Sequence, residues 1–300
     1  MALYRLRHPA LLAAFALACL ACTGPRSVWL SPEAVPKGKF RVGGGMDVNL
    51  PTQTAEALYG GLEQGVESLY DRASGSDTGK VAITADSLND MARALVAYSV
   101  DPLGMHPSLF IRYGLLRRVD VGYRLAGGVH AFDARVQFLG PVDGGPGWRG
   151  SIGAQYSSQD YALPSLFGKL QKLLRYEFKR KDILIPVVLG KPIGPDGRYG
   201  SFGIGGAYDA ALIEYDSEIL RLVEKVDGNT VRPFRNLRGE RTIHSFGAFA
   251  NAHLGYRWVF AVPSLAVYRQ DYGAFPLFGG EEAKLAGWTF VPSFGLEARF

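Results

Sequence analysis

The final segment of the chain, residues 288–300, alternates between two kinds of side chain. Because successive side chains of a β-strand point to opposite faces, the pattern predicts a strand with one apolar face and one small or charged face. The apolar face carries Trp288, Phe290, Pro292, Phe294, Leu296, Ala298 and Phe300. The other face carries Thr289, Val291, Ser293, Gly295, Glu297 and Arg299. Such strands build a β-barrel or a β-sandwich, and the abundance of glycine on the non-apolar faces of the chain favours the barrel.

The chain ends on an aromatic residue, Phe300, directly after this run. In that respect it resembles the closing strand of bacterial outer-membrane β-barrels. The resemblance implies that Phe300 belongs to the signal read by the barrel-assembly machinery. It also implies a location in the bacterial outer membrane, with membrane lipid and the assembly machinery as partners.

Nine further segments have the pattern of strands. They cover residues 40–50, 108–115, 119–125, 132–138, 148–156, 182–190, 199–212, 244–256 and 258–268. Single-chain bacterial barrels have an even number of strands. The sequence therefore predicts an all-β, up-and-down antiparallel transmembrane β-barrel of about ten strands over residues 39–300, with eight or twelve as alternatives. Short and long connections largely alternate, which predicts that the N- and C-termini are both periplasmic.

The start of the chain has the pattern of a signal peptide over residues 1–21. Cys22 follows Leu-Ala and precedes Thr-Gly, a sequence that resembles a bacterial lipobox and implies lipidation at Cys22. Cleavage by an ordinary signal peptidase is the alternative. Residues 22–38 contain several prolines and no periodicity, so they are predicted to form an N-terminal tether.

Composition restricts the classes of function. Both cysteines, Cys19 and Cys22, lie at the leader, so the remaining chain has no disulfide framework and no thiolate metal site. The formal net charge of +5 falls to +3 without residues 1–21, and so mild a charge argues against a nucleic-acid partner. The sequence predicts no metal and no cofactor.

The connection 52–106 is too long for a bare loop and is predicted to be a helical insert between the first two strands. Apolar residues recur at helical spacing, with Leu58 and Leu62 in one helix and Leu88 and Met91 in the next. Each helix must bury its apolar face. It can do so in the mouth or lumen of the barrel, or against the other helix above the membrane.

A second connection, 163–181, is predicted to contain a basic amphipathic helix at the membrane surface. Its predicted contacts with lipopolysaccharide phosphate are Lys169, Lys172, Arg175 and Lys179. The alternative is a solvated loop helix that packs on the barrel rim.

The inward faces of the predicted strands combine glycine with isolated charges. The charged side chains are predicted to form a polar network in the lumen: Asp47, Arg112, Asp120, Arg124, Asp133, Arg135, Arg149, Glu297 and Arg299. Glycine leaves space for long side chains, a ligand or an inserted helix. Because small barrels are usually filled by side chains, a charged plug is the default.

The segment 182–190 is apolar on both faces. A strand of this kind is covered on both faces. The inward Leu184 and Val188 are therefore predicted to pack on an insert or to line a site for an apolar ligand.

Catalytic motifs are weak. The chain has no Walker loop, no His-Glu-x-x-His and no Gly-x-Ser-x-Gly, and no catalytic residue is predicted. The leading hypothesis is an outer-membrane barrel that binds or passes a small, partly apolar molecule. The alternatives are a structural or surface-interaction barrel with a plugged lumen and, after it, an outer-membrane hydrolase.

The assembly signal leads to a first prediction. Phe300→Asp should sharply reduce the heat-modifiable folded band in membranes, because recognition reads the end of the chain. Normal amounts of folded protein would show that Phe300 is dispensable for assembly.

Overall fold

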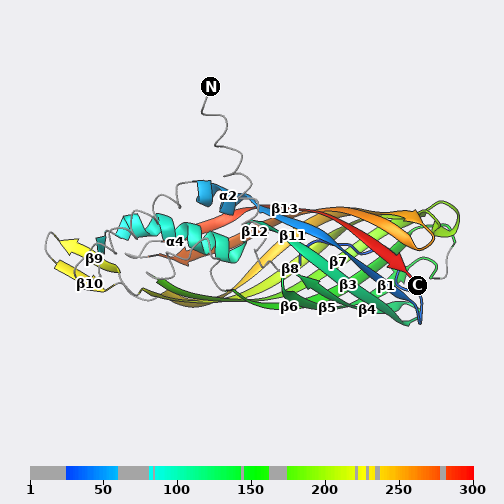
Figure 1. Ribbon diagram of the computed structural model, residues 1–300, viewed down its shortest axis with the longest axis horizontal. Coiled ribbons are helices and arrows are strands. Elements are labelled where there is room, and N and C mark those ends of the chain that lie inside the picture. Colours follow the sequence, from blue (N-terminus) through cyan, green and yellow to red (C-terminus); the bar gives the residue numbers. More distant parts are fainter. Residues whose placement is uncertain are drawn as a thin grey trace, which may run out of the picture.

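The computed structural model describes residues 25–59, 81–83, 85–142, 145–161, 174–219, 222–227, 230–233, 237–277 and 282–300. Ten strands close into a barrel in which neighbouring strands are antiparallel (Figure 1). They are β1 (Phe40–Pro51), β3 (Gly104–Leu116), β4 (Val119–Ala126), β5 (Val129–Leu139), β6 (Arg149–Tyr161), β7 (Leu174–Ile193), β8 (Gly200–Ile219), β11 (Leu237–Tyr256), β12 (Val259–Pro276) and β13 (Glu282–Arg299). The predicted fold class, with its helical insert after the first strand, is confirmed.

The two ends of the barrel differ. At one end, here called the turn end, short turns join β3 to β4, β7 to β8 and β11 to β12. The barrel also closes there, since the N–H groups of Phe40 and Phe300 donate to each other's carbonyls at 3.2 and 3.0 Å. At the other end, here called the insert end, the connection from β1 to β3 carries helices (Figure 1).

Large apolar side chains are exposed on the outside of the barrel, among them Leu109, Phe132, Ile183, Ile204, Phe246, Leu265 and Phe294. Aromatic side chains lie toward both ends of this belt. Those near the turn end include Trp148, Tyr199, Tyr256 and Trp258, and those nearer the insert end include Tyr123, Tyr156, Tyr208 and Trp288. An exposed apolar belt between two aromatic girdles is the surface of a barrel that spans a lipid bilayer.

Several strands are longer than a membrane requires. β7, β8 and β11 each have 20 residues, whereas a strand crosses the bilayer in about 9–11 residues. The outward face of β7 changes toward the insert end from the apolar Ile183 to Lys181 and Lys179. Lys181 forms an ion pair with Glu214 of β8 at 3.1 Å. The wall therefore continues beyond the apolar belt as a charged extension.

The basic helix predicted at 163–181 is wrong over residues 174–181, which belong to β7. Lys169 and Lys172 lie outside the described residues. The described stretch also has a period of two, because buried Phe178 and Arg180 alternate with the exposed side chains on β7. Residues 174–181 are extended rather than helical because the strand prolongs the hydrogen-bonded ladders with β6 and β8.

The insert end carries two helices and a small sheet. α2 spans Thr52–Tyr59 and α4 spans Ala85–Val100. β2 (Val81–Ile83) runs parallel to β9 (Leu222–Asp227), which pairs with β10 (Thr230–Pro233) at the far tip of the molecule (Figure 1). No sequence pattern predicted this sheet. Among the described residues, no helix is long and apolar enough to cross a membrane.

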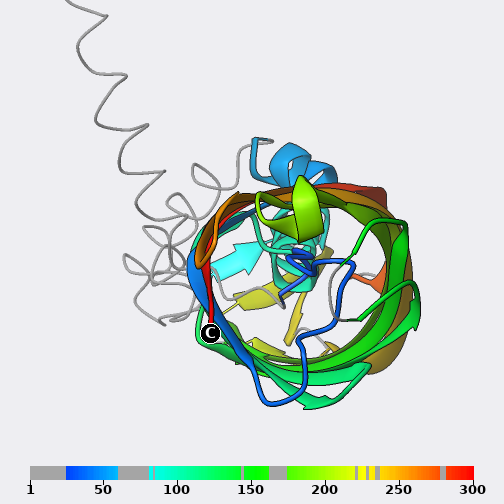
Figure 2. The same ribbon diagram turned by 90° about the vertical axis from the view of Figure 1, so that its right-hand side faces the viewer.

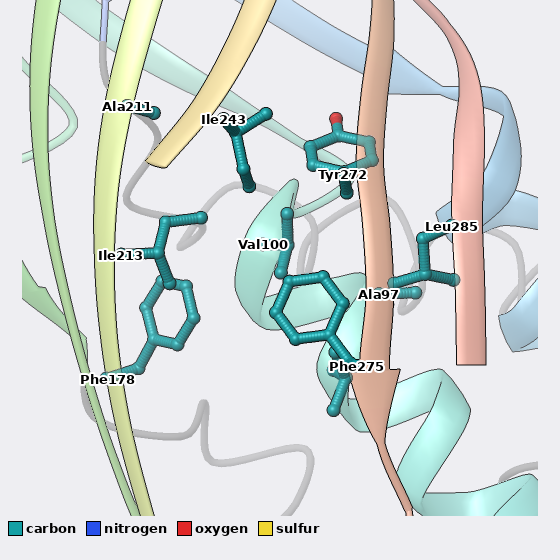
Figure 3. Close-up of a cluster of buried hydrophobic side chains, with 10 residues drawn as sticks. Ala97, Val100, Phe178, Ala211, Ile213, Ile243, Tyr272, Phe275 and Leu285 are labelled. Carbon is teal, nitrogen blue, oxygen red and sulfur yellow. The ribbon is translucent and has the colours of Figure 1, made fainter. Parts of the chain in front are cut away.

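α4 lies in the mouth of the barrel. Its residues Val96, Ala97 and Val100 are buried in an apolar cluster with side chains of the wall (Figure 3). The wall residues are Phe178, Ala211, Ile213, Ile243, Tyr272, Phe275 and Leu285. Of the two arrangements left open for the insert, the structure has the one in which a helix enters the mouth. The side chains of Leu58, Leu62, Leu88 and Met91 lie outside the described part of the chain.

The contact between α4 and the wall can be tested at Ile213, which is completely buried. Ile213→Ala should lower the free energy of unfolding by about 2–5 kcal/mol, because it leaves a cavity beneath the helix. Urea titration of the protein folded in lipid vesicles measures the change. Ile204→Ala on the exposed face of the same strand is the matched control and should cost clearly less. Equal losses for the two variants would contradict the packing of α4.

Candidate functional site in the plugged lumen

The described N-terminal residues lie inside the barrel (Figure 2). Residues 25–36, here called the plug, form neither helix nor strand, and Arg26, Ser27 and Val28 are buried. The plug runs from the insert end, where Arg26 pairs with Asp101, to the turn end, where the Gly38 N–H donates to Gly114 at 2.8 Å. The sequence predicted a tether over 22–38. The structure instead encloses residues 25–36.

Side chains of the wall bind the main chain of the plug. Six wall side chains donate hydrogen bonds to carbonyl groups of the plug. Gln155 donates to the Pro25 carbonyl, Tyr268 to that of Arg26, and Arg124 to that of Ser27. Asn251 donates to the carbonyls of Val28 and Leu30, Ser264 to that of Val28, and Arg135 to those of Ser31 and Glu33. The N–H groups of Ala34 and Val35 donate to Gln137 and Asp120 at 3.0 and 2.7 Å. Because buried main-chain groups must be hydrogen-bonded, these side chains do for the plug what a strand ladder does elsewhere.

Trp29 is the main side-chain anchor of the plug. Its ring NH donates to Ser293 at 2.7 Å, and its ring meets Phe110 edge-on, with centroids 5.8 Å apart. The Arg124 guanidinium lies 4.9 Å from the ring centroid. A Cβ added at Gly45 or Gly295 would lie 2.8 or 2.9 Å from the ring. Glycine at these inward positions leaves space for the indole and also for the close backbone approach of β1 and β13, since the added Cβ atoms would meet backbone atoms of the neighbouring strand as well.

Val28 fills the place that Leu184 and Val188 offer. These two wall residues are buried with Val28, Phe249 and Tyr268 in one apolar cluster. The sequence proposed an insert or a ligand as their partner. The structure brings them against the plug, whereas the described part of α4 packs in a separate cluster nearer the insert end.

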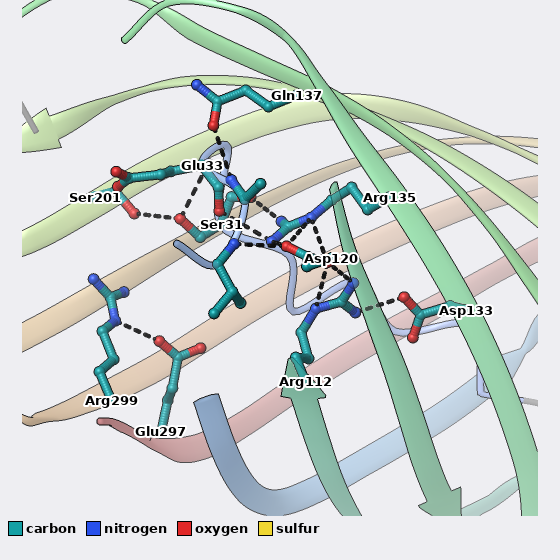
Figure 4. Close-up of polar contacts among 12 residues, drawn as sticks. Ser31, Glu33, Arg112, Asp120, Asp133, Arg135, Gln137, Ser201, Glu297 and Arg299 are labelled. Atoms are coloured by element: carbon teal, nitrogen blue, oxygen red, sulfur yellow. Dashed lines mark hydrogen bonds and ion pairs between the residues drawn. The ribbon is translucent and has the colours of Figure 1, made fainter. Parts of the chain in front are cut away.

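The predicted network residues all lie in the lumen, and the structure joins them in several groups. Figure 4 shows those around Asp120 and Glu297. Asp120 is bound by both Arg112 and Arg135, and Arg112 also pairs with Asp133 at 2.7 Å. Asp47 pairs with Arg124 at 2.6 Å, and Glu297 pairs with Arg299 at 2.7 Å. Arg149 reaches Glu33 of the plug at 2.5 Å.

Sequence reasoning missed the polar partners that the plug contributes. Ser27, Ser31 and Glu33 contact the network, but they lie in the segment taken for a tether. The sequence placed His253 on the inward face of its strand but not in the network, and the structure buries it 3.4 Å from Glu297. A clue was available in the sequence, since a solvated tether gains nothing from Val28, Trp29 and Val35.

Asp101, just after α4, connects the plug to the end of this helix. It pairs with Arg26 and accepts hydrogen bonds from Asn49 at 2.6 Å, Tyr272 at 2.7 Å and Thr289 at 2.6 Å. Burial raises the pKa of this carboxyl, but the guanidiniums of Arg26 and Arg180 outweigh it and hold the pKa below its usual value. Through these contacts Asp101 links the end of α4 to the plug and to the wall.

A cavity of about 40 Å³ remains beside the plug. Its lining includes the apolar residues Trp29, Phe110, Leu184 and Pro186 and the polar residues Arg112, Arg124, Asp133 and Gln155. This volume holds a few water molecules, whereas sites for drug-sized ligands measure about 300–1,000 Å³.

The remaining predicted sites are placed as follows. The signal peptide and Cys22 lie outside the described residues. Phe300 is exposed at the turn end, and Lys179 is exposed on the charged extension of β7. Arg175 lies on β7, but its side chain is not among those described. No group of three or more His, Cys, Asp or Glu residues within the described ranges could hold a metal ion.

The contact between Trp29 and the barrel wall can be tested by a substitution in the wall. Gly295→Val should push the ring away and raise the hydrogen-exchange rates of residues 26–35 at least about tenfold, because opening of the plug becomes easier. Exchange measured by mass spectrometry reports the rates. Gly206→Val is the matched control, since a Cβ there meets nothing closer than 3.6 Å. Unchanged exchange in Gly295→Val would contradict the role of Trp29.

The sequence matches no protein-family model and no curated protein. The solved structures to which the chain is similar include the following three. The attachment invasion locus protein Ail of Yersinia pestis is 9% identical, over 88% of this chain and 99% of that chain, with a TM-score of 0.31. The outer membrane protease OmpT from Escherichia coli is 10% identical, over 90% and 100%, with a TM-score of 0.41. Neisserial surface protein A is 9% identical, over 88% and 100%, with a TM-score of 0.26. The closed ten-stranded antiparallel barrel with an exposed apolar belt is the fold of the bacterial outer-membrane β-barrel proteins.

Proposed function

We propose that this protein is an outer-membrane barrel that is closed at rest and acts through its surface, as a structural or surface-interaction barrel. The observation that carries the proposal is the plug, which fills the lumen and is bound along its length by side chains of the wall. At the insert end, α4 packs on the inside of the wall through Val96, Ala97 and Val100. What the protein offers to partners is then the charged extension and the insert end rather than a pore.

In the proposed orientation the turn end faces the periplasm and the insert end faces outward. Its support is the contrast between tight turns at one end and the helical insert at the other. This orientation puts Phe300 where the periplasmic assembly machinery would read it. The first described residue, Pro25, lies in the lumen. The periplasmic N-terminus therefore stays a prediction from the sequence.

Lipopolysaccharide is the proposed lipid partner in the outer leaflet. The supporting observation is the position of Lys179 and Lys181, which face outward just beyond the apolar belt of β7. Because Lys181 already pairs with Glu214, Lys179 is the better phosphate contact on this strand. These contacts come from a strand rather than from the helix that the sequence predicted.

A second candidate function is the binding or passage of a small, partly apolar molecule. The cavity beside Trp29 favours it, because both apolar and charged side chains line it. Its present volume of about 40 Å³ means that the plug would have to shift before an organic molecule could enter. No catalytic step is part of either proposal, and an outer-membrane hydrolase remains the least supported alternative.

Conductance in planar lipid bilayers tests the closed barrel. The intact protein should show no stepwise conductance, whereas a variant lacking residues 25–36 should conduct, because its lumen is no longer filled. Gly206→Val, altered on the outer face, is the control and should remain closed. Steady conductance of the intact protein would rule out a closed resting state and favour the second candidate.

A further inference from the structure

We infer that the lumen is a binding site for an extended peptide and that residues 25–36 occupy it as a built-in, displaceable ligand. This inference rests on the plug described above as the basis of the closed barrel. It adds a ligand class, extended polypeptide, and the chemistry by which the wall recognises it.

The first argument is the kind of contact that holds the plug. The wall binds main-chain groups at Pro25, Arg26, Ser27, Val28, Leu30, Ser31, Glu33, Ala34 and Val35. Main-chain groups are the same in every residue except proline, so such bonds read an extended backbone rather than a particular sequence. Peptide-binding proteins combine main-chain bonds for affinity with a few pockets for specificity.

The second argument is that pockets occur at two neighbouring side chains. Val28 enters the cluster around Leu184 and Val188. Trp29 lies against Phe110 and Arg124, in the space that Gly45 and Gly295 leave. The site therefore specifies an aliphatic residue followed by tryptophan, within an otherwise loosely specified extended segment.

The third argument is that the wall holds its own charges in place. Asp120 with Arg112 and Arg135, Asp133 with Arg112, and Asp47 with Arg124 are pairs between strands of the barrel. These pairs do not need the plug. An emptied lumen would keep Arg112, Arg124 and Arg135 paired with wall carboxylates, so this part of the site persists when its ligand leaves.

The fourth argument is the way the plug joins the barrel. Lys37, Gly38 and Lys39 are exposed between the plug and β1, and Gly38 has a positive φ of 77° with no atom near its missing Cβ. The chain can be cut here without breaking a barrel strand. The cut fragment would then be held only by non-covalent contacts, as a ligand is.

The experiment places a specific protease site between Lys37 and Gly38 of the full chain, folded in lipid vesicles. After cleavage, a fluorescent peptide of residues 25–36 is added and its binding is measured by anisotropy. We expect the labelled peptide to replace the cut fragment. A Trp29→Ala peptide should compete about a hundredfold more weakly, because it loses the indole contacts. A Leu30→Met peptide, which conserves side-chain volume, is the control and should compete within about threefold.

The outcomes separate this inference from the closed barrel. If the heat-modifiable folded band is lost on cleavage, or if the cut fragment never exchanges, the segment is a structural core element and the peptide site is refuted. Equal competition by the Trp29→Ala peptide would refute the Trp29 pocket. Conductance of the uncut protein would instead refute the closed barrel and leave the exchange result to stand by itself.

Discussion

Asp120 is the residue on which the interior of this barrel depends. It is fully buried, and it is bound by Arg112 and Arg135 of the wall and by the Val35 N–H of the plug at 2.7 Å. Burial of a charge is tolerated only when partners replace its water. Asp120 therefore requires both guanidiniums, and these in turn bring Asp133 and the Ser31 and Glu33 carbonyls into the same group. The network thus holds the plug in one position through the contacts of Asp120 and Arg135 with its main chain.

The barrel could be predicted from the sequence because lipid enforces a strict alternation of side chains. Where that constraint ends, the prediction failed. Beyond Ile183 the outward face of β7 meets water, so Lys179 and Lys181 replace apolar residues and the strand signal weakens. The helical pattern then looked better than the strand that the neighbouring ladders impose.

The sequence predicted the side chains of the wall that form the site, but not the plug that occupies it. Inward charges at Asp47, Asp120 and Arg135 follow from the strand register, and glycines at 45 and 295 indicated space. What fills the space could not be predicted from periodicity, because the plug has none. Its hydrogen bonds come from side chains such as Asn251 and Arg135, which lie far away in the sequence. Long-range pairing of this kind leaves no local pattern in the segment that it holds.

The position of the plug has a consequence for how the barrel assembles. β1 follows the plug directly along the chain, and its pairing with β13 is the seam that closes the ring. Because the plug and β1 are continuous in the chain, the plug can be laid along the nascent sheet while β1 and β13 are still apart. Arg112 and Arg135, which hold Asp120, lie on β3 and β5, so neither side chain belongs to a strand of the seam. In this view the N-terminal segment acts as an internal template on which the barrel closes.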